Sequence, residues 1–116
     1  MTERSFSQAY RLLRRREFSS FTRQNPSVRT DTVVIQWKKN DLPVIRIGIT
    51  MANRFGKAVE RTRFRRHVRE AFRLSELRYM QGFDLHVRVI AKEPDGFHAL
   101  QKLFAKIAQI LKKRQP

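Results

Sequence analysis

The chain has 116 residues, which is enough for one domain with one hydrophobic core and leaves little room for a second. Its 26 Lys and Arg residues outnumber 10 Asp and Glu residues, so the formal net charge is +16, well above the roughly 2–8 charges that keep a small domain soluble. This excess favours a polyanionic partner, while a hydrophobic fraction of 41% excludes wholesale disorder and the lack of Cys excludes disulfides and thiolate zinc sites.

The choice of basic residue favours nucleic acid as that partner. Eighteen of the 26 basic residues are Arg, whose planar guanidinium binds phosphate through two parallel hydrogen bonds and also stacks on bases. No segment approaches the roughly 18–20 consecutive apolar residues of a membrane span, and residues 1–6 have no apolar signal core. We therefore expect a cytoplasmic protein without a membrane partner.

The first element predicted in chain order is a short helix. Residues 1–11 are mostly polar and are expected to be mobile. Residues 14–23 are predicted to form a helix that carries Phe18 and Phe21 on one face. The helix ends before Pro26, because the residue that precedes a proline disfavours the helical conformation.

Two strands are predicted next. Residues 32–37 are β-branched and aromatic, and residues 44–50 alternate cleanly, so that Trp37 and Ile47 face inward and Arg46 faces outward. Because residues 38–41 have the composition of a turn, the two strands are expected to pair as an antiparallel hairpin.

The second half of the chain predicts a helix, a strand and a helix. Residues 58–77 contain no Gly or Pro and form a long helix that Gly82 follows. Residues 83–90 alternate as a third strand, and residues 97–113 carry a helical apolar stripe. The order helix, strand, strand, helix, strand, helix, with room for one extra short strand, predicts a single α+β domain over residues 1–116 in which a sheet packs against helices.

The long helix has two different faces. A helical wheel gathers Phe64, Val68, Ala71 and Phe72 into an apolar stripe that can pack on the sheet. Arginines fill the side away from that stripe, namely Arg63, Arg65, Arg66, Arg69 and Arg73. Charged faces that only meet solvent usually mix signs, and like charges four residues apart destabilise an isolated helix by a few tenths of a kcal/mol. Arg61 alone falls inside the apolar sector, so it must reach the surface or lie beyond the edge of the sheet.

These residues resemble a known family. The run from Gly48 to Phe72, GITMANRFGKAVERTRFRRHVREAF, is similar to the signature of the bacterial ribonuclease P protein subunit, which has Gly-x-Ala-Val followed by Arg-Asn-Arg-x-Lys-Arg-x-x-Arg. Thr62 stands where the family usually has Asn, and Arg65 where it has Lys. Lys57 and Asn53 replace a usual Asn and a common Lys in the preceding loop.

The resemblance implies an accessory role in removing the 5′ leader of precursor tRNA. In that enzyme a large RNA is the catalyst and uses Mg²⁺, so no catalytic residue and no bound metal are expected in this chain, and DNA is not an expected partner. The mixed sheet would have a left-handed crossover, as in ribosomal-protein-like sandwiches. The residues implied as contacts of the catalytic RNA, with Arg73 added from the wheel, are Arg54, Lys57, Arg61, Arg63, Arg65, Arg66, Arg69 and Arg73.

The resemblance also implies that a cleft between the first helix and the sheet guides the leader strand. The aromatic candidates are Phe18, Phe21 and Trp37, because aromatic rings stack on unpaired bases with little sequence preference. Phe18 and Phe21 can equally be core residues. Arg46 and Arg88 are outward residues that either contact phosphates in this cleft or are solvated.

Two other functions stay open at this point. A small RNA-binding module of the ribosomal kind would share the basic helix but would not prefer a substrate with a leader. A stand-alone nuclease would need His67, His86 or His98 to act together with Asp84.

Overall fold

The computed structural model describes residues 11–12, 15–52, 56–91 and 96–113. In chain order the elements are strand β1 (Arg11–Leu12), the 3-10 helix η1 (Arg15–Ser20), strands β2 (Ser27–Arg29), β3 (Val33–Lys39) and β4 (Ile45–Met51), helix α2 (Ala58–Arg73), the 3-10 helix η3 (Glu76–Tyr79), strand β5 (Phe83–Val89) and helix α3 (Gly96–Lys112). The predicted α+β class is confirmed, with β1 and β2 as short additional strands. The expected mobility concerns residues 1–10, which lie outside the described residues, whereas Arg11 belongs to β1.

The sheet has five strands in the order β1-β4-β5-β3-β2. Strand β4 runs parallel to both β1 and β5, while β3 is antiparallel to β5 and to β2. The predicted hairpin of β3 with β4 is therefore wrong, because β5 lies between the two strands. The connection between them is tied to the start of β5, since Asn40 N donates to Gly82 O at 3.0 Å and Gly82 N donates to Val44 O at 2.9 Å. Gly82 has φ +81°, a conformation that favours glycine.

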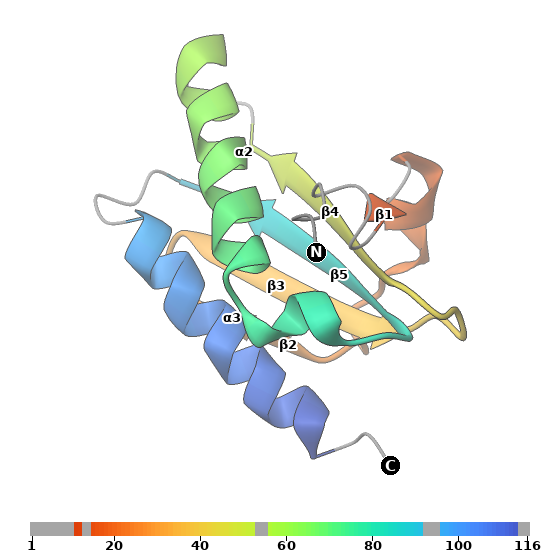
Figure 1. Cartoon of the computed structure of the whole chain (residues 1–116). Coiled ribbons are helices and arrows are strands. Elements are labelled where there is room, and N and C mark those ends of the chain that lie inside the picture. Colours follow the sequence, from red (N-terminus) through yellow and green to blue (C-terminus); the bar gives the residue numbers. More distant parts are fainter. Residues whose placement is uncertain (1–10, 13–14, 53–55, 92–95, 114–116) are drawn as a thin grey trace.

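The connection from β4 through α2 to β5 has the uncommon hand. Both strands point the same way and α2 lies in front of the sheet (Figure 1). With the strands turned to point upward, the chain passes from β4 leftward to β5, which makes a left-handed crossover, as the family resemblance implies. Right-handed connections are the general rule for parallel strands.

Helices α2 and α3 lie side by side on one face of the sheet and enclose the core (Figure 1). Strand residues alternate as predicted, because Ile35, Ile47 and Val87 point into this core and are fully buried. From α3, Leu100, Phe104 and others complete the apolar cluster. The opposite face of the sheet carries the even-numbered residues of β3, β4 and β5, and η1 contacts it. We call this second surface the open face.

The basic helix is shorter than predicted. Helix α2 ends at Arg73 rather than residue 77, and a separate turn, η3, follows it. Ser75 separates the two because its side chain accepts a hydrogen bond from Leu77 N at 3.2 Å and so caps η3. Within the described part of the chain, no helix has the length and apolar character needed to cross a membrane.

Candidate nucleic-acid interface

Helix α2 is fixed to the molecule by the apolar stripe that its sequence predicts. Its buried residues are Phe64, Val68, Ala71 and Phe72. The Phe72 ring meets the Phe104 ring of α3 edge-on, with 5.9 Å between centroids. Such contacts hold the helix in one orientation, so the direction of its remaining side chains is fixed as well.

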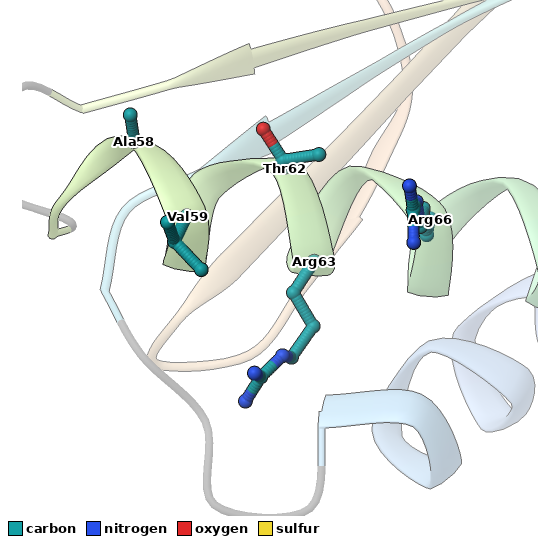
Figure 2. A pocket seen from close by; sticks show the side chains of 5 residues that line it. All are labelled: Ala58, Val59, Thr62, Arg63 and Arg66. Carbon is teal, nitrogen blue, oxygen red and sulfur yellow. The ribbon is translucent and has the colours of Figure 1, made fainter.

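Three predicted RNA contacts project from the outer side of α2. Arg63, Arg66 and Arg69 are all exposed. Figure 2 shows Arg63 extending away from the helix beside an open hollow that Ala58, Val59, Thr62 and Arg66 also line. A second hollow further along the helix has Arg66 and Arg69 among its lining residues. These guanidinium groups therefore border a surface that a phosphate backbone can approach.

The first turn of α2 adds positive potential to this surface. Lys57 is exposed at the N-cap position, and its backbone N–H donates to Glu60 Oε1 at 3.1 Å. The N-terminus of a helix carries a partial positive charge that favours anions. The predicted contact Arg54 lies outside the described residues.

Arg61 and Arg65 lie on the other side of α2, toward β4. Arg61 Nη1 donates to Ala52 O at 3.1 Å, and Arg65 Nη1 makes a longer contact of 3.5 Å with Ile49 O. Both side chains are half-buried. The position of Arg61 in the apolar sector is thus explained, because its guanidinium reaches past the core to the residue that follows β4.

Arg73 is matched by a neighbouring acid. It binds Glu70 through Nε–Oε1 at 3.1 Å and Nη2–Oε2 at 2.5 Å. This hydrogen bond lowers the pKa of the Glu70 carboxyl below its ordinary value. The positive surface of α2 therefore weakens toward the C-terminal end of the helix.

The second predicted site lies on the open face, where the rings of Phe18 in η1 and of Phe21, directly after η1, cover one side chain of β5. The centroids of Phe18 and Phe21 lie 4.7 and 5.4 Å from the centroid of His86. Phe18 and Phe21 are half-buried, so each ring keeps exposed area. The helix predicted over residues 14–23 is the shorter η1, and it brings both aromatic rings to one place.

His86 is a neutral side chain at the floor of this site. Burial, together with a smaller effect of the nearby charge of Arg88, lowers the pKa of His86 to about 4. Its Nε2 lies 2.9 Å from Thr50 Oγ1. Two aromatic rings tilted over a neutral imidazole form a largely apolar surface, and bases can stack on exposed aromatic faces of this kind.

Lys38 and Gln36 of β3 complete the open face beside η1. Lys38 Nζ lies 5.2 Å from the centroid of the Phe21 ring and bonds Ser20 Oγ, while Gln36 Nε2 donates to Thr22 O at 2.8 Å. Neither residue was singled out from the sequence. Both have even positions on β3 and pair in register with His86 and Asp84 of β5. Once the strand order is known, this alternation places them on the open face.

The remaining predicted cleft residues are placed differently from one another. Trp37 does not line the open face, and its assignment to the cleft is corrected here. It is 3% exposed within the core cluster, because odd-numbered residues of β3 face the helices. Arg88 is exposed on the open face, beside His86 in β5. Arg46 also lies there, but both sides of its guanidinium bind carboxylates.

The histidines are not gathered into a catalytic or metal-binding group. His67 lies on α2 between Phe64 and Phe97, at 6.2 and 6.1 Å between centroids, on the helix side of the sheet. His86 lies on the open face instead. Among the described residues, no three His, Asp or Glu side chains are arranged to hold a metal ion.

Comparison with known proteins gives consistent matches along the chain. A family model described as Ribonuclease P matches residues 6–114. The ribonuclease P protein component of Geotalea uraniireducens is 31% identical over 113 residues, 97% of each chain, and that of Thermotoga petrophila is 40% identical over 87 residues, 75% of this chain and 74% of the relative. The solved structure of the RNase P protein from Thermotoga maritima superposes with a TM-score of 0.66 at 27% identity, covering 90% of this chain and 97% of its own. An RNase P protein from Staphylococcus aureus shares the fold with a TM-score of 0.68 at 22% identity, covering 89% of this chain and 95% of its own.

Proposed function

The chain belongs to the ribonuclease P protein family, and on that premise we propose that it binds the catalytic RNA through α2 and the 5′ leader of precursor tRNA across the open face. Membership makes the chain the protein component of a ribonucleoprotein endoribonuclease. The finer statement, that it assists removal of the leader to form the mature 5′ end in the cytoplasm, is the proposal.

The observation that carries the proposal is the separation of two surfaces by the sheet. Exposed arginines occupy the helix side, and the paired rings of Phe18 and Phe21 occupy the other. A guanidinium binds a phosphate of a folded RNA through two parallel hydrogen bonds, whereas aromatic rings stack on the bases of an unpaired strand. A protein with both surfaces can contact a structured RNA and a single-stranded leader together.

The α2 surface is proposed as the contact with the catalytic RNA. Arg63, Arg66 and Arg69 supply exposed charge, and Lys57 adds charge at the helix N-terminus. Arg61 and Arg65 are half-buried and fixed against β4, so they are proposed to act at the margin of the interface. Arg54 and Arg73 stay in the proposal as outlying contacts.

The open face is proposed as the path of the leader strand. Phe18 and Phe21 offer faces for bases, and the neutral His86 lies beneath them without adding charge. Lys38 and Arg88 are the basic residues that border this surface and can contact phosphates. Stacking contributes roughly 1–3 kcal/mol per base with little sequence preference, which suits leaders of varied sequence.

Mg²⁺ is proposed to act on the RNA rather than on the protein. Divalent magnesium takes carboxylate and phosphate oxygens as ligands, and no cluster of three acidic or His side chains exists in the described ranges. The described residues therefore provide no protein-only cage of the kind that would hold Mg²⁺ without RNA phosphates. What its side chains supply is positive charge against RNA phosphates, which lowers the demand for cations during assembly.

Reconstitution tests this function. Adding the chain to its cognate catalytic RNA should restore cleavage of precursor tRNA at low Mg²⁺. If the RNA cleaves equally well with and without the protein, the proposed function is wrong. Affinities for precursor and mature tRNA, measured in the presence of the catalytic RNA, then separate this function from a general RNA-binding module, which would bind both alike. Cleavage by the protein without RNA would instead support a stand-alone nuclease.

A further inference from the structure

Arg46 lies between two carboxylates that belong to different elements. Its Nε and Nη2 donate to Asp84 Oδ1 and Oδ2 at 2.8 and 2.7 Å, which is a paired contact with a neighbouring strand. Its Nη1 donates to Glu17 Oε2 at 2.5 Å on η1. One guanidinium thus joins β5, β4 and η1, at sequence separations of 38 and 29 residues.

The pair formed by Arg46 and Asp84 is the part of this arrangement that lies within the sheet. Asp84 is 1% exposed and also accepts a hydrogen bond from Asn40 Nδ2 at 2.8 Å. The hydrogen bond with Asp84 raises the pKa of Arg46 above its ordinary value, with both carboxylates adding to the effect. Because paired geometry fixes the plane of a guanidinium, the direction of Nη1 toward Glu17 is set by the sheet.

The contact of Arg46 with Glu17 holds η1, a helix that few backbone hydrogen bonds stabilise. A 3-10 helix has poorer hydrogen-bond geometry than an α-helix, and η1 spans only six residues. Glu17 directly precedes Phe18, whose ring must lie against His86 for the open face to keep its shape. An anchor at Glu17 therefore fixes the backbone at the point where the first aromatic ring leaves it.

The charge balance argues against Arg46 as a phosphate contact. Asp84 and Glu17 occupy both sides of its guanidinium, so its positive charge is already matched by carboxylates. A phosphate would have to displace Glu17 or meet its charge. The sequence alone indicated that Arg46 contacts phosphates or is solvated. Neither alternative includes its contacts with two carboxylates.

We propose that Glu17, Arg46 and Asp84 form a positioning element that holds η1 on the sheet so that Phe18 and Phe21 stay over His86. The consequence for leader binding rests on the proposed function of the open face. Arg46 acts through η1 and does not touch the RNA. The element makes the aromatic surface available in the free protein, so that a leader strand meets a site already formed.

Glu17→Ala is the informative variant, because the two possible roles of Glu17 predict opposite changes in the binding of precursor tRNA. If Glu17 were only an acid near a polyanion, its removal would tighten binding of every RNA. If it anchors η1, the preference of the holoenzyme for precursor over mature tRNA should fall, by roughly threefold or more for the loss of a partly exposed ion pair. Glu17→Gln keeps an acceptor oxygen at the same reach and should recover part of the loss. Asp31→Ala removes an exposed acid elsewhere and is the matched control.

A second readout does not depend on RNA. Release of η1 would expose His86, so NMR titration should show the pKa of His86 rising from about 4 toward its ordinary value in Glu17→Ala and not in Asp31→Ala. If the wild-type holoenzyme showed no preference for a substrate with a leader, the proposed function would be wrong. The His86 titration would still test whether Glu17 holds η1 on the sheet. An unchanged His86 titration in Glu17→Ala, or tighter binding of precursor tRNA, overturns the inference.

Discussion

The ring of Phe18 lies against the imidazole of His86 with 4.7 Å between centroids and 47° between planes. The first residue comes from the short helix η1 and the second from β5, near the middle of the sheet. His86 is only 9% exposed, so Phe18 shields it from water and also offers its own outer face. The same contact thus buries His86 and fixes the position of the Phe18 ring on the open face.

Replacement of Phe18 by Ala should weaken binding of precursor tRNA by the holoenzyme. Loss of one stacking surface costs roughly 1–3 kcal/mol per base, which is about a five- to 150-fold change in Kd. Affinity for mature tRNA, which has no leader, should stay the same. Tyr79→Ala removes a highly exposed ring of η3 and serves as the control. Equal losses in both variants would remove Phe18 from the leader site.

Folding stability should fall in acid because of His86. Its pKa is about 4 in the folded protein and near 6.5 when unfolded, so between these values the unfolded chain binds the extra proton. The unfolding free energy therefore decreases as the pH falls from about 6.5 to about 4, by up to roughly 3 kcal/mol. Urea unfolding of the wild type and of His86→Gln across this range isolates the contribution of His86 from that of the carboxylates. Parallel pH profiles would contradict the assignment.

The exposed arginines of α2 should control the salt dependence of RNA binding. Replacing Arg66 and Arg69 by Ala should make the slope of log K against log salt shallower by about 1.4–1.8, since two phosphate contacts are lost. Lys102 and Lys106 are exposed on α3, and their double replacement removes the same charge. Binding of the catalytic RNA at several salt concentrations distinguishes the two pairs. The same flattening in both would mean that net charge, rather than the α2 surface, sets the slope.

Phe72 should be a determinant of stability rather than of binding. It is fully buried against Phe104, so Phe72→Ala leaves a cavity and should lower the unfolding free energy by roughly 3–5 kcal/mol. Chemical denaturation measures the change. Leu74→Ala, at a residue that is 54% exposed, should change stability by less than about 0.5 kcal/mol. A similar small effect at Phe72 would show that α2 is not held by its apolar stripe.

Patterns local to one element could be predicted from the sequence. The apolar stripe of α2 and the inward residues of the strands are confirmed, because burial of a helix or strand face leaves a period that the sequence displays. The exposed Arg63, Arg66 and Arg69 followed from the same wheel, whereas Arg65, which the wheel also placed outward, is half-buried toward β4. Arg61 could not be placed on that wheel, since its path depends on where β4 ends relative to the helix.

Relations between distant elements could not be predicted in the same way. Alternation in β3 and β4 shows which residues share a face, but it does not say that β5 lies between the two strands. The set of residues predicted for the open face was therefore incomplete. Trp37 was assigned to this face, although its odd position on β3 faces the helices. Arg46 was interpreted as a phosphate contact or a solvated side chain, because its two carboxylate partners are 29 and 38 positions away in the chain.

The contacts of Arg61 and Arg65 have a consequence for solubility. Among the described residues, β1 pairs with β4 at Arg46 and Ile47, and no described strand pairs with the outer side of β4 beyond Ile47. Arg65 Nη1 lies 3.5 Å from the Ile49 carbonyl of this strand, and Arg61 Nη1 donates to the carbonyl of Ala52, the residue after β4. Charge placed along a strand edge is a known safeguard against aggregation, because an incoming strand would have to displace it. Arg61 and Arg65 thus place positive charge beside the end of β4, where charge opposes pairing with a strand of another chain.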